Sequence, residues 1–307
     1  MRPNRAYRIH GYGGPEVLHQ DLAPVPTARP GQVLVKVKAA GVNGLDWKIR
    51  EGLLRDVRTL AFPAVLGCEL MGVVTSPGGG RFRTGDRVMG PASLGAYADT
   101  VAVGVATLCH VPETLTDVQA AALPVAALTA WQALRAAGEF RPWMKVLIHG
   151  AAGGVGGFAV QFAKAASATV LATAGGSSCD HVLQLGADDV IDYRAERFED
   201  RVADVDLVLD LVGGEILDRS WQVLSLDGAI VSVVAPDVAT RAPAGLRGVW
   251  WPMHSDALRL AQIATDVSSG RLHSTIAEVV GFSELPSAIE RTKTGHAPGK
   301  IVVDLTC

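Results

Sequence analysis

The sequence predicts an α/β protein with two domains, one β-rich and one built on a doubly wound parallel sheet. Residues 1 to about 120 contain short strand signals separated by turns, whereas residues 145–234 alternate strand and helix signals. Strands that alternate with helices predict a parallel sheet with helices on both faces. The length of 307 residues also fits two domains of ordinary size.

The β-rich part is predicted from short alternating segments. In residues 33–38 every second residue is valine, and two of the others are lysine, which is the period of a half-buried strand. Further short strands are expected at residues 72–75, 87–89 and 95–103. From Thr116 the apolar period becomes helical. Helices are expected at residues 117–123 and 124–134.

Residues 145–173 read as a strand, a glycine turn, a helix and a second strand. Residues 146–148 form an apolar run, and apolar residues recur at helical spacing from Val155 to Ala166. Between them, residues 151–156 read Ala-Ala-Gly-Gly-Val-Gly, an A-x-G-x-x-G variant of the dinucleotide fingerprint. Because glycine has no side chain, the backbone of this turn can come close to a pyrophosphate, whose charge then lies at the positive N-terminus of the following helix. Nucleotide binding is therefore favoured over a turn that is glycine-rich only for tight chain reversal.

The loop after the second strand of this unit bears on which nucleotide binds. A site for NAD usually carries an acidic residue about 20 residues after the glycines, where it accepts from the ribose 2′-hydroxyl. Residues 173–178 read Thr-Ala-Gly-Gly-Ser-Ser, and no acidic residue occurs before Asp180. The missing carboxylate favours NADP, with Ser177 and Ser178 either binding the 2′-phosphate or serving as ordinary loop serines. No Arg or Lys lies in this loop, so the expected preference is moderate.

Two further strand–helix repeats follow the glycine turn. Strands are expected at residues 190–193, 205–212 and 229–234, with a helix at 216–224. Near residue 270 the pattern ends, and residues 275–307 contain two strand signals around one helix signal. About thirty residues are too few for a core of their own, so we expect them to return to the first domain. The expected boundaries are 1–121 with 270–307 for the β-rich domain and 122–269 for the nucleotide-binding domain.

Composition and charge exclude several other classes of protein. The chain is 49% hydrophobic and 19% charged, with net charge −3 and no basic runs, so neither nucleic acid nor a membrane is an expected partner. No apolar run reaches transmembrane length, and the first five residues lead into no apolar signal core. The four cysteines are too scattered for a C-x-x-C pair, which favours free thiols in a cytoplasmic protein.

Taken in order, these motifs resemble zinc-independent medium-chain dehydrogenases/reductases, and among them the NADPH:quinone oxidoreductases of the ζ-crystallin type. Each segment is a modest signal, but their order and spacing are specific and span nearly the whole chain. The segments are residues 11–18, 40–52, 62–74, 84–90, 121–134, 151–156, 185–188 and 299–303. The resemblance implies a GroES-like domain, a Rossmann domain and NADPH in the cleft between them. It also implies a homodimer, for which edge strands near residues 229–234 are the expected contact.

Zinc-dependent relatives hold a catalytic ion through a Cys and a His, and the resemblance places Asn43 and Cys68 at these positions. An amide is a poor zinc ligand, and one thiol without Cys or His neighbours does not complete a tetrahedral site. The cysteine lobe of structural zinc is also missing, since residues 75–99 contain no cysteine. We therefore expect no bound metal, and without a Lewis acid the dehydrogenation of alcohols is disfavoured.

The resemblance also implies roles for individual residues. Asn43 is the candidate catalytic residue, and with Thr129 it would contact the nicotinamide carboxamide. Tyr193 would lie against the adenosine, and the stretch 299–300 would close over the nicotinamide. The implied cofactor-binding set is Asn43, Thr129, Ala152, Gly153, Gly154, Val155, Gly156, Thr173, Ser177, Ser178, Tyr193, Val212, Val234, Gly299 and Lys300.

The implied substrate pocket contains Trp47, Cys68, Trp250 and Trp251. Exposure or interface packing explains the two adjacent tryptophans equally well, and Cys68 fits the role of a small apolar filler better than that of a reactive thiol.

The implied function is NADPH-dependent reduction of a quinone or an α,β-unsaturated carbonyl by hydride transfer, without zinc. Two alternatives remain open: a dedicated enoyl or enone reductase of a biosynthetic pathway, and a non-catalytic NADP(H)-binding protein on the same scaffold. Hydride transfer to a quinone needs no ionisable side chain, because the phenolate product can take its proton from water. The site is accordingly expected to lack histidine and paired carboxylates, and Asp46, Tyr97 and His149 are interpreted as structural.

Overall fold

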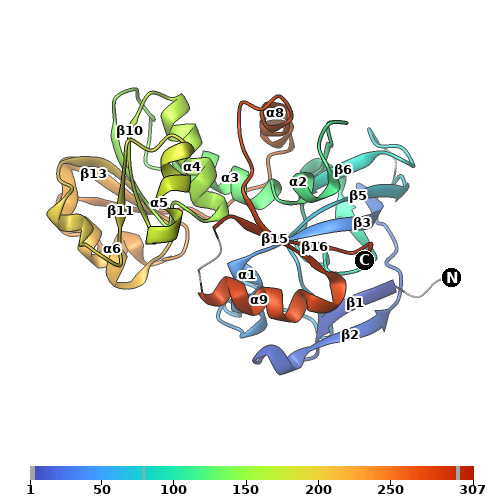
Figure 1. Ribbon diagram of the computed structural model, residues 1–307. Helices are drawn as coiled ribbons and strands as arrows, with labels where there is room; N and C mark the ends of the chain where they lie inside the picture. Colours follow the sequence, from blue (N-terminus) through green and yellow to red (C-terminus); the bar gives the residue numbers. More distant parts are fainter. Residues whose placement is uncertain (1–3, 79, 295–297) are drawn as a thin grey trace. The chain divides into compact units, whose positions relative to one another are not determined.

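The computed structural model describes residues 4–78, 80–294 and 298–307, and the chain forms two compact units (Figure 1). Unit 1 consists of Met1–Val125, Ser255–Arg271 and Ile276–Cys307, and unit 2 of Ala126–His254 and Leu272–Thr275. Residues 255–269 thus belong to unit 1 by their contacts, whereas the expected boundary kept 122–269 together. The sequence analysis expected no apolar signal core after the first five residues. Of these, residues 1–3 lie outside the described part of the chain.

Unit 1 is built on a seven-stranded sheet with the order β15-β16-β3-β5-β6-β8, in which β7 also pairs with β3. The strands are β3 (Gln32–Val42), β5 (Glu69–Ser76), β6 (Arg87–Pro91), β7 (Thr100–Gly104), β8 (Cys109–His110), β15 (Ile276–Gly281) and β16 (Lys300–Asp304). A smaller sheet contains β2 (Leu18–Ala23), β1 (Asn4–Ile9) and β4 (Ala64–Val65) in that order. Because β16 pairs antiparallel with β3, the C-terminal segment joins the main sheet of unit 1.

The alternation expected around residues 33–38 is confirmed in β3. Val33, Val35 and Val37 are each at most 3% exposed, whereas Lys36 is exposed. The strand expected at 95–103 starts only at Thr100. The prediction of a strand at residues 95–99 was wrong, because Gly95 has φ +103° and Ala98 forms only an isolated bridge with Ala6.

Among the described residues, four helices pack in unit 1 and a fifth runs on into unit 2. They are α1 (Gly44–Arg50), α2 (Asp117–Ala121), α8 (Ala257–Ser268), α9 (Leu285–Thr294) and the shared α3 (Pro124–Ala133). The short α2 begins at the N-cap Thr116, whose hydroxyl accepts from the Gln119 N–H. The sequence analysis predicted neither α1 nor α8. A sequence signal for α8 was present, because Asp256 is its N-cap and accepts from the Arg259 N–H at 2.8 Å.

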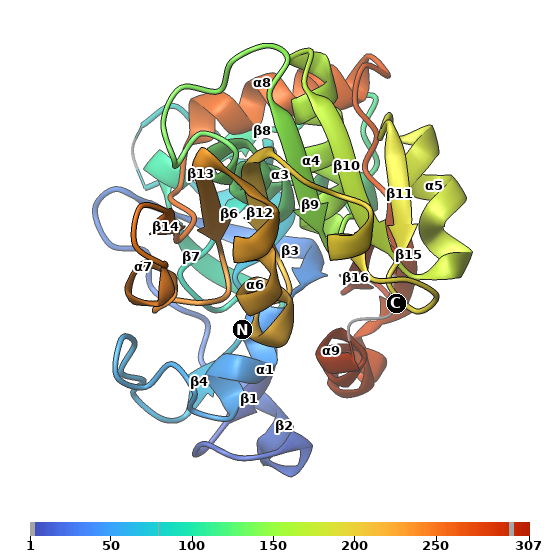
Figure 2. The same cartoon turned by 90° about the vertical axis from the view of Figure 1, so that its left-hand side faces the viewer.

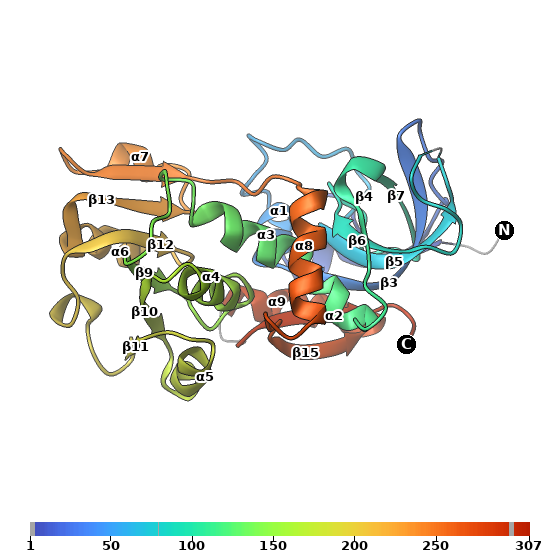
Figure 3. The same ribbon diagram turned by 90° about the horizontal axis from the view of Figure 1, so that it is seen from above.

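Unit 2 is built on a parallel sheet with the order β11-β10-β9-β12-β13-β14. The order runs from right to left in Figure 2, and its first five strands appear from bottom to top in Figure 3. The strands are β9 (Lys145–His149), β10 (Thr169–Ala174), β11 (Asp189–Asp192), β12 (Val205–Asp210), β13 (Leu224–Ser232) and β14 (Arg247–Trp250). Their helices are α4 (Gly154–Ala165), α5 (Cys179–Gln184), α6 (Gly214–Ser220) and α7 (Val238–Arg241).

In chain order the unit 2 sheet reads 3-2-1-4-5-6, the strand order of a doubly wound dinucleotide-binding domain. The order reverses between β9 and β12, and ligands of such sheets bind outside the carboxyl ends of the strands at this point. The expectation of an edge strand near residues 229–234 was wrong, because β13 pairs with a strand on each side. The strand at that edge is β14.

Each unit has its own hydrophobic core. The core of unit 1 gathers valines of β3 with Leu66, Leu70 and Tyr97, and that of unit 2 gathers Leu147, Phe198 and other apolar side chains around β9 and β12. Within residues 4–78, 80–294 and 298–307, no helix is both long and apolar enough to cross a membrane.

Candidate functional site

The glycine turn lies directly after β9, at the point where the strand order of unit 2 reverses. Gly150 has φ +71°, a conformation that favours glycine. A Cβ added to Gly156 would lie 2.3 Å from the Gly150 carbonyl oxygen, so glycine is needed for α4 to start this close to the turn. Gly153 is the N-cap of α4 and supplies no side-chain hydrogen bond, which leaves the first-turn N–H groups open to an anionic ligand.

Two more loops border this turn. A Cβ built on Gly150 would lie 3.3 Å from Val212 Cγ2, and one built on Gly213 would lie 3.2 Å from Val234 Cγ2. Val212 is 54% exposed and Val234 is half-buried. The fold therefore brings Val212 beside the glycine turn and Val234 beside the loop of Val212, and both are among the expected cofactor-binding residues.

Asp210 and Ser232, which the sequence motifs did not single out, hold these loops in place. Both are fully buried. Asp210 Oδ1 accepts from the N–H groups of Val212 and Gly213 at 3.0 and 2.8 Å, and Oδ2 accepts from the Ser232 hydroxyl at 2.7 Å. Ser232 Oγ in turn accepts from the Val234 N–H at 3.2 Å. The sequence signal was an aspartate that ends an apolar strand immediately before Leu-Val-Gly-Gly.

Thr173 was expected to contact the cofactor, but its side chain points into unit 2. Thr173 is 4% exposed, and its hydroxyl bonds to His149 Nδ1 at 3.0 Å. The other ring nitrogen of His149 bonds to the Ser220 hydroxyl at 3.0 Å. Burial lowers the pKa of His149 to about 3, so the ring is neutral and the structural interpretation of this histidine is confirmed. Any contact of Thr173 with a cofactor would come from its backbone.

The expected 2′-phosphate loop follows β10. Residues Gly176–Ser178 form a short 3-10 turn, in which Ser177 is exposed and Ser178 is half-buried. Tyr193 follows the neighbouring strand β11, is 49% exposed, and donates its N–H to the Ala174 carbonyl at 3.2 Å. The fold thus brings Tyr193 to the loop that contains both serines.

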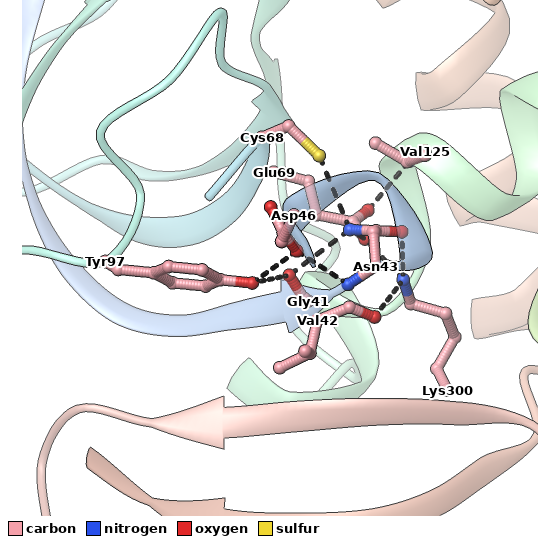
Figure 4. A network of polar contacts seen from close by, with 9 residues as sticks. All are labelled: Gly41, Val42, Asn43, Asp46, Cys68, Glu69, Tyr97, Val125 and Lys300. Atoms are coloured by element: carbon pink, nitrogen blue, oxygen red, sulfur yellow. Dashed lines mark hydrogen bonds and ion pairs between the residues drawn. The ribbon is translucent and has the colours of Figure 1, made fainter. Parts of the chain in front are cut away.

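In unit 1, Asn43 lies in a buried polar network at the start of α1 (Figure 4). Its side-chain NH2 donates to Glu69 Oε1 at 2.8 Å, to the Gly41 carbonyl at 3.3 Å and to Cys68 Sγ at 3.5 Å. Its Oδ1 accepts from Lys300 Nζ at 2.7 Å. Only one orientation of the amide satisfies both the carboxylate and the ammonium, so the network fixes which way Asn43 faces.

Lys300 and Glu69 form a buried ion pair. Lys300 Nζ lies 2.6 Å from Glu69 Oε1 and also donates to the Val42 carbonyl at 3.2 Å, with exposures of 5% for Lys300 and 0% for Glu69. Glu69 Oε2 accepts from the N–H of Val125 at 2.7 Å. With Asn43 Oδ1, the three protons of the ammonium are all engaged. The Lys300 side chain therefore has no proton left for a cofactor, and the expected role falls to the backbone of residues 299–300.

Asp46 and Tyr97 complete the network. Asp46 Oδ2 accepts from the Asn43 backbone N–H at 2.8 Å and from the Tyr97 hydroxyl at 2.6 Å. Burial raises the pKa of Asp46 to about 6, although both hydrogen bonds and the Lys300 charge act in the opposite direction. Asp46 Oδ1 is buried without a partner among the described residues. Asp46 orders its turn, as the sequence indicated, and Glu69, which the sequence motifs did not single out, lies in the same network.

Zinc does not fit this network. The ammonium of Lys300 already lies against the carboxylate and the amide oxygen that a cation would need. Burial, with the neighbouring carboxylates, raises the pKa of the Cys68 thiol well above its usual range, which disfavours the thiolate that binds zinc. No cluster of three or more His, Cys, Asp or Glu side chains suited to a metal occurs in the described part of the chain. The absence of bound metal stays a prediction, for elemental analysis to test.

The four expected pocket residues are divided between the units. Trp47 and Cys68 belong to unit 1, where Trp47 is half-buried and Cys68 is 6% exposed. Trp250 and Trp251 belong to unit 2, as does Thr129, which is 6% exposed on α3. Trp250 is 40% exposed, whereas Trp251 is half-buried and its indole N–H donates to Gln132 Oε1 at 3.3 Å.

Gly41→Ala is expected to lower the free energy of unfolding by about 1–3 kcal/mol, because overpacking displaces buried groups. The added Cβ would lie 2.2 Å from Glu69 Oε1, so the carboxylate would have to leave Asn43 and Lys300. Gly44→Ala is the matched control, since its Cβ would meet only Trp47 Nε1 at 3.7 Å. Gly44 opens a helix, so we expect a neutral change or a gain of up to about 1 kcal/mol. Equal urea-unfolding curves for both variants would contradict this account of the network.

Comparison with known proteins identifies the class to which the two units belong. An alcohol dehydrogenase GroES-like domain matches residues 29–134, and a zinc-binding dehydrogenase family matches residues 185–303. The human NAD(P)H oxidoreductase RTN4IP1, mitochondrial, is 32% identical over 98% of this chain and 89% of its own length.

Two solved structures resemble the chain over nearly its whole length. The quinone oxidoreductase from Coxiella burnetii has a TM-score of 0.92 at 34% identity, covering 99% of this chain and 100% of that one. The Escherichia coli quinone oxidoreductase complexed with NADPH has a TM-score of 0.88 at 26% identity, covering 98% and 100%.

A GroES-like unit and a doubly wound unit with this glycine turn define a medium-chain dehydrogenase/reductase. Within that class, the chain belongs to the quinone oxidoreductase family. The expected family and fold class are therefore confirmed. The second matching family carries zinc binding in its description, whereas the residues at the expected ligand positions of this chain, Asn43 and Cys68, are poorly suited to bind zinc.

Proposed function

We propose that this protein is an NADPH-dependent oxidoreductase that reduces a quinone by hydride transfer, without zinc. The observation that carries the proposal is the open glycine turn at the switch point of a 3-2-1-4-5-6 sheet, in a chain of the quinone oxidoreductase family. The NADPH complex of the Escherichia coli relative and the name of the human relative support the choice of cofactor.

The residues of unit 2 fit a dinucleotide. The uncapped first turn of α4 would bind the pyrophosphate through Gly154, Val155 and Gly156, with Ala152 and Gly153 shaping the approach. Asp210 and Ser232 hold Val212 and Val234 where apolar side chains would limit the nucleotide. Tyr193, Ser177 and Ser178 lie on the loops that would meet the adenosine ribose.

In unit 1, Asn43 is the residue that we assign to the nicotinamide. The amide hydrogens of Asn43 are already engaged with Glu69 and the Gly41 carbonyl, whereas Oδ1 is an acceptor and takes a hydrogen bond from Lys300. Asn43 would therefore accept from the carboxamide NH2, and the buried ion pair would hold it in that orientation. Thr129 is the second proposed contact with the carboxamide.

Bound NADPH would supply the hydride, and the protein would supply position rather than acid–base chemistry. Tyr97 is fully buried, its hydroxyl proton is donated to Asp46, and burial raises its pKa well above the usual range. This tyrosine is therefore poorly suited to protonate a substrate. A quinone needs no such acid, because the phenolate formed by hydride transfer can be protonated by water.

Oxidation of NADPH by the purified protein, followed at 340 nm against a panel of quinones and 2-alkenals, tests this function. We expect turnover with quinones. Turnover confined to 2-alkenals would favour a dedicated enone reductase. NADPH binding without turnover of either class would favour a non-catalytic nucleotide-binding protein.

Binding of NADPH is expected to be tighter than binding of NADH by about 1–2 kcal/mol, the scale of one or two hydrogen bonds to a charged group. The physical reason is that residues 173–178 contain no carboxylate to repel the 2′-phosphate. Calorimetric titration with each nucleotide measures the difference. Equal dissociation constants would reject this part of the proposal.

The remaining parts of the proposal concern the setting of the activity. We infer a cytoplasmic homodimer. The human relative is named as mitochondrial, so the compartment needs direct localisation. Analytical ultracentrifugation tests the oligomeric state.

A further inference from the structure

The fold brings a basic side chain to the 2′-phosphate loop, which contains none in its own sequence. Tyr193 and Arg194 follow β11, the strand that pairs in parallel with β10, and the loop follows β10. A Cβ built on Gly175 would lie 3.4 Å from Arg194 Cζ, 3.5 Å from Arg194 Nε and 3.3 Å from the Tyr193 hydroxyl. The guanidinium and the phenol therefore border the first residue of this loop.

The guanidinium of Arg194 is available for a ligand. Nearby arginines are committed to carboxylates: Arg197 pairs with Glu199 at 2.9 Å, and Arg201 pairs with Asp189 and Glu196 at 2.9 Å. Arg194 is exposed, and its guanidinium makes no ion pair or hydrogen bond with any residue in the described ranges. Its side chain lies over the ring of Tyr193, with Cζ 5.7 Å from the ring centroid.

The other charges around the loop are negative. A Cβ built on Gly176 would lie 2.7 Å from Asp192 Oδ2. Asp192, Asp180 and Glu196 are also close enough to raise the pKa of Cys179, next to the loop, although its burial is the larger cause. The negative charge of a phosphate bound here would be repelled by these carboxylates unless a cation lay between them. Arg194 is the cation that the fold places at the loop.

We propose that Arg194 binds the 2′-phosphate of NADPH and is the residue that makes the site selective for it over NADH. A planar guanidinium can donate two parallel hydrogen bonds to a phosphate, and such charge-assisted bonds are stronger than those of the loop serines. Tyr193 would hold the guanidinium by its ring. This inference rests on the proposed function, and it assigns the nucleotide preference to one side chain.

Arg194→Gln tests the assignment, with Arg197→Gln as the matched control, because Arg197 is an exposed arginine three residues away that is paired with Glu199. Calorimetric titration of the full chain with NADPH and NADH, repeated with 2′,5′-ADP and 5′-AMP, gives the four dissociation constants. For Arg194→Gln we expect the constants for NADPH and 2′,5′-ADP to rise roughly 10- to 100-fold, the scale of losing hydrogen bonds to a charged group. NADH and 5′-AMP should bind as before, and Arg197→Gln should change none of the four.

Gly175→Asp tests whether the 2′-phosphate binds at this loop, and Arg194→Gln then assigns the binding to one side chain. Gly175 has φ −82° and ψ 147°, which any residue adopts, and the new carboxylate would lie beside Arg194. It should weaken NADPH and strengthen NADH. The inference is overturned if Arg194→Gln leaves NADPH binding unchanged or weakens both nucleotides equally. Either result leaves the proposed function standing, whereas failure of the unaltered protein to bind either nucleotide would overturn both.

Discussion

Glu69→Ala is expected to lower the free energy of unfolding by about 3–5 kcal/mol, the range for breaking a buried ion pair by removing one partner. The variant leaves the Lys300 ammonium, 5% exposed, with only the Asn43 amide oxygen and the Val42 carbonyl as partners among the described residues. It also removes one acceptor of the Asn43 amide and the carboxylate oxygen that accepts from the Val125 N–H. Urea unfolding of the purified variants at pH 7 measures the loss.

Two controls separate the buried charge from other effects of Glu69→Ala. Glu278→Ala removes one partner of the Glu278–Arg291 pair, in which the side chains are 43% and 39% exposed, and should cost at most about 1 kcal/mol. The double variant Glu69→Ala/Lys300→Met removes both buried charges and should recover a large part of the loss. If Glu69→Ala costs no more than Glu278→Ala, the pair is not buried as described.

The free energy of unfolding of Asp46→Asn is compared with that of the unaltered protein at each pH. As the pH rises from 4 to 7, we expect this difference to change by about 2–3 kcal/mol in favour of the variant. The pKa of Asp46 is raised from 3.8 to about 6 in the folded protein, chiefly by burial. Between these values the folded protein holds a proton that the unfolded chain has released. The stability contributed by neutral Asp46 is therefore fully present below pH 3.8 and is lost as the pH rises through about 6. The loss amounts to about 1.4 kcal/mol for each pH unit between the two pKa values.

The measurement is the difference between the unfolding free energies of variant and unaltered protein at several pH values. Subtraction removes the titration of other groups, provided that they do not interact with residue 46. Asp227→Asn, a change of an exposed aspartate on β13, serves as the control and should run parallel to the unaltered protein. A difference that stays constant from pH 4 to 7 would show that Asp46 ionises normally.

The same network shows how far the candidate site could be read from the sequence. Asn43 and Lys300 were identified by resemblance to a family, but the reason that they act together is the Glu69 carboxylate between them. The contacts of Lys300 span 231 residues to Glu69 and 257 to Asn43. A lysine and a glutamate usually lie at the surface, so periodicity provides no sign that this pair is buried.

The nucleotide loop shows the same limit. Reading along the chain, the segment 173–178 lacks a basic residue, and that is correct. Arg194 reaches the loop because β10 and β11 are neighbours in a parallel sheet, which brings their carboxyl ends to one edge. The sheet order also corrected the expected edge strand, since β14 pairs with β13 and covers it.

The sequence alone determined the features that depend on short windows of the chain. The glycine turn between β9 and α4 is specified by backbone conformations that glycine adopts, and the burial of β3 by an apolar period of two. Tertiary structure alone decided which polar side chains meet: Glu69 with Lys300, Tyr97 with Asp46, and Arg194 with the loop at Gly175. The physical reason is that a turn or a strand follows from local backbone and burial preferences, whereas a polar contact depends on which distant strands become neighbours and in which register.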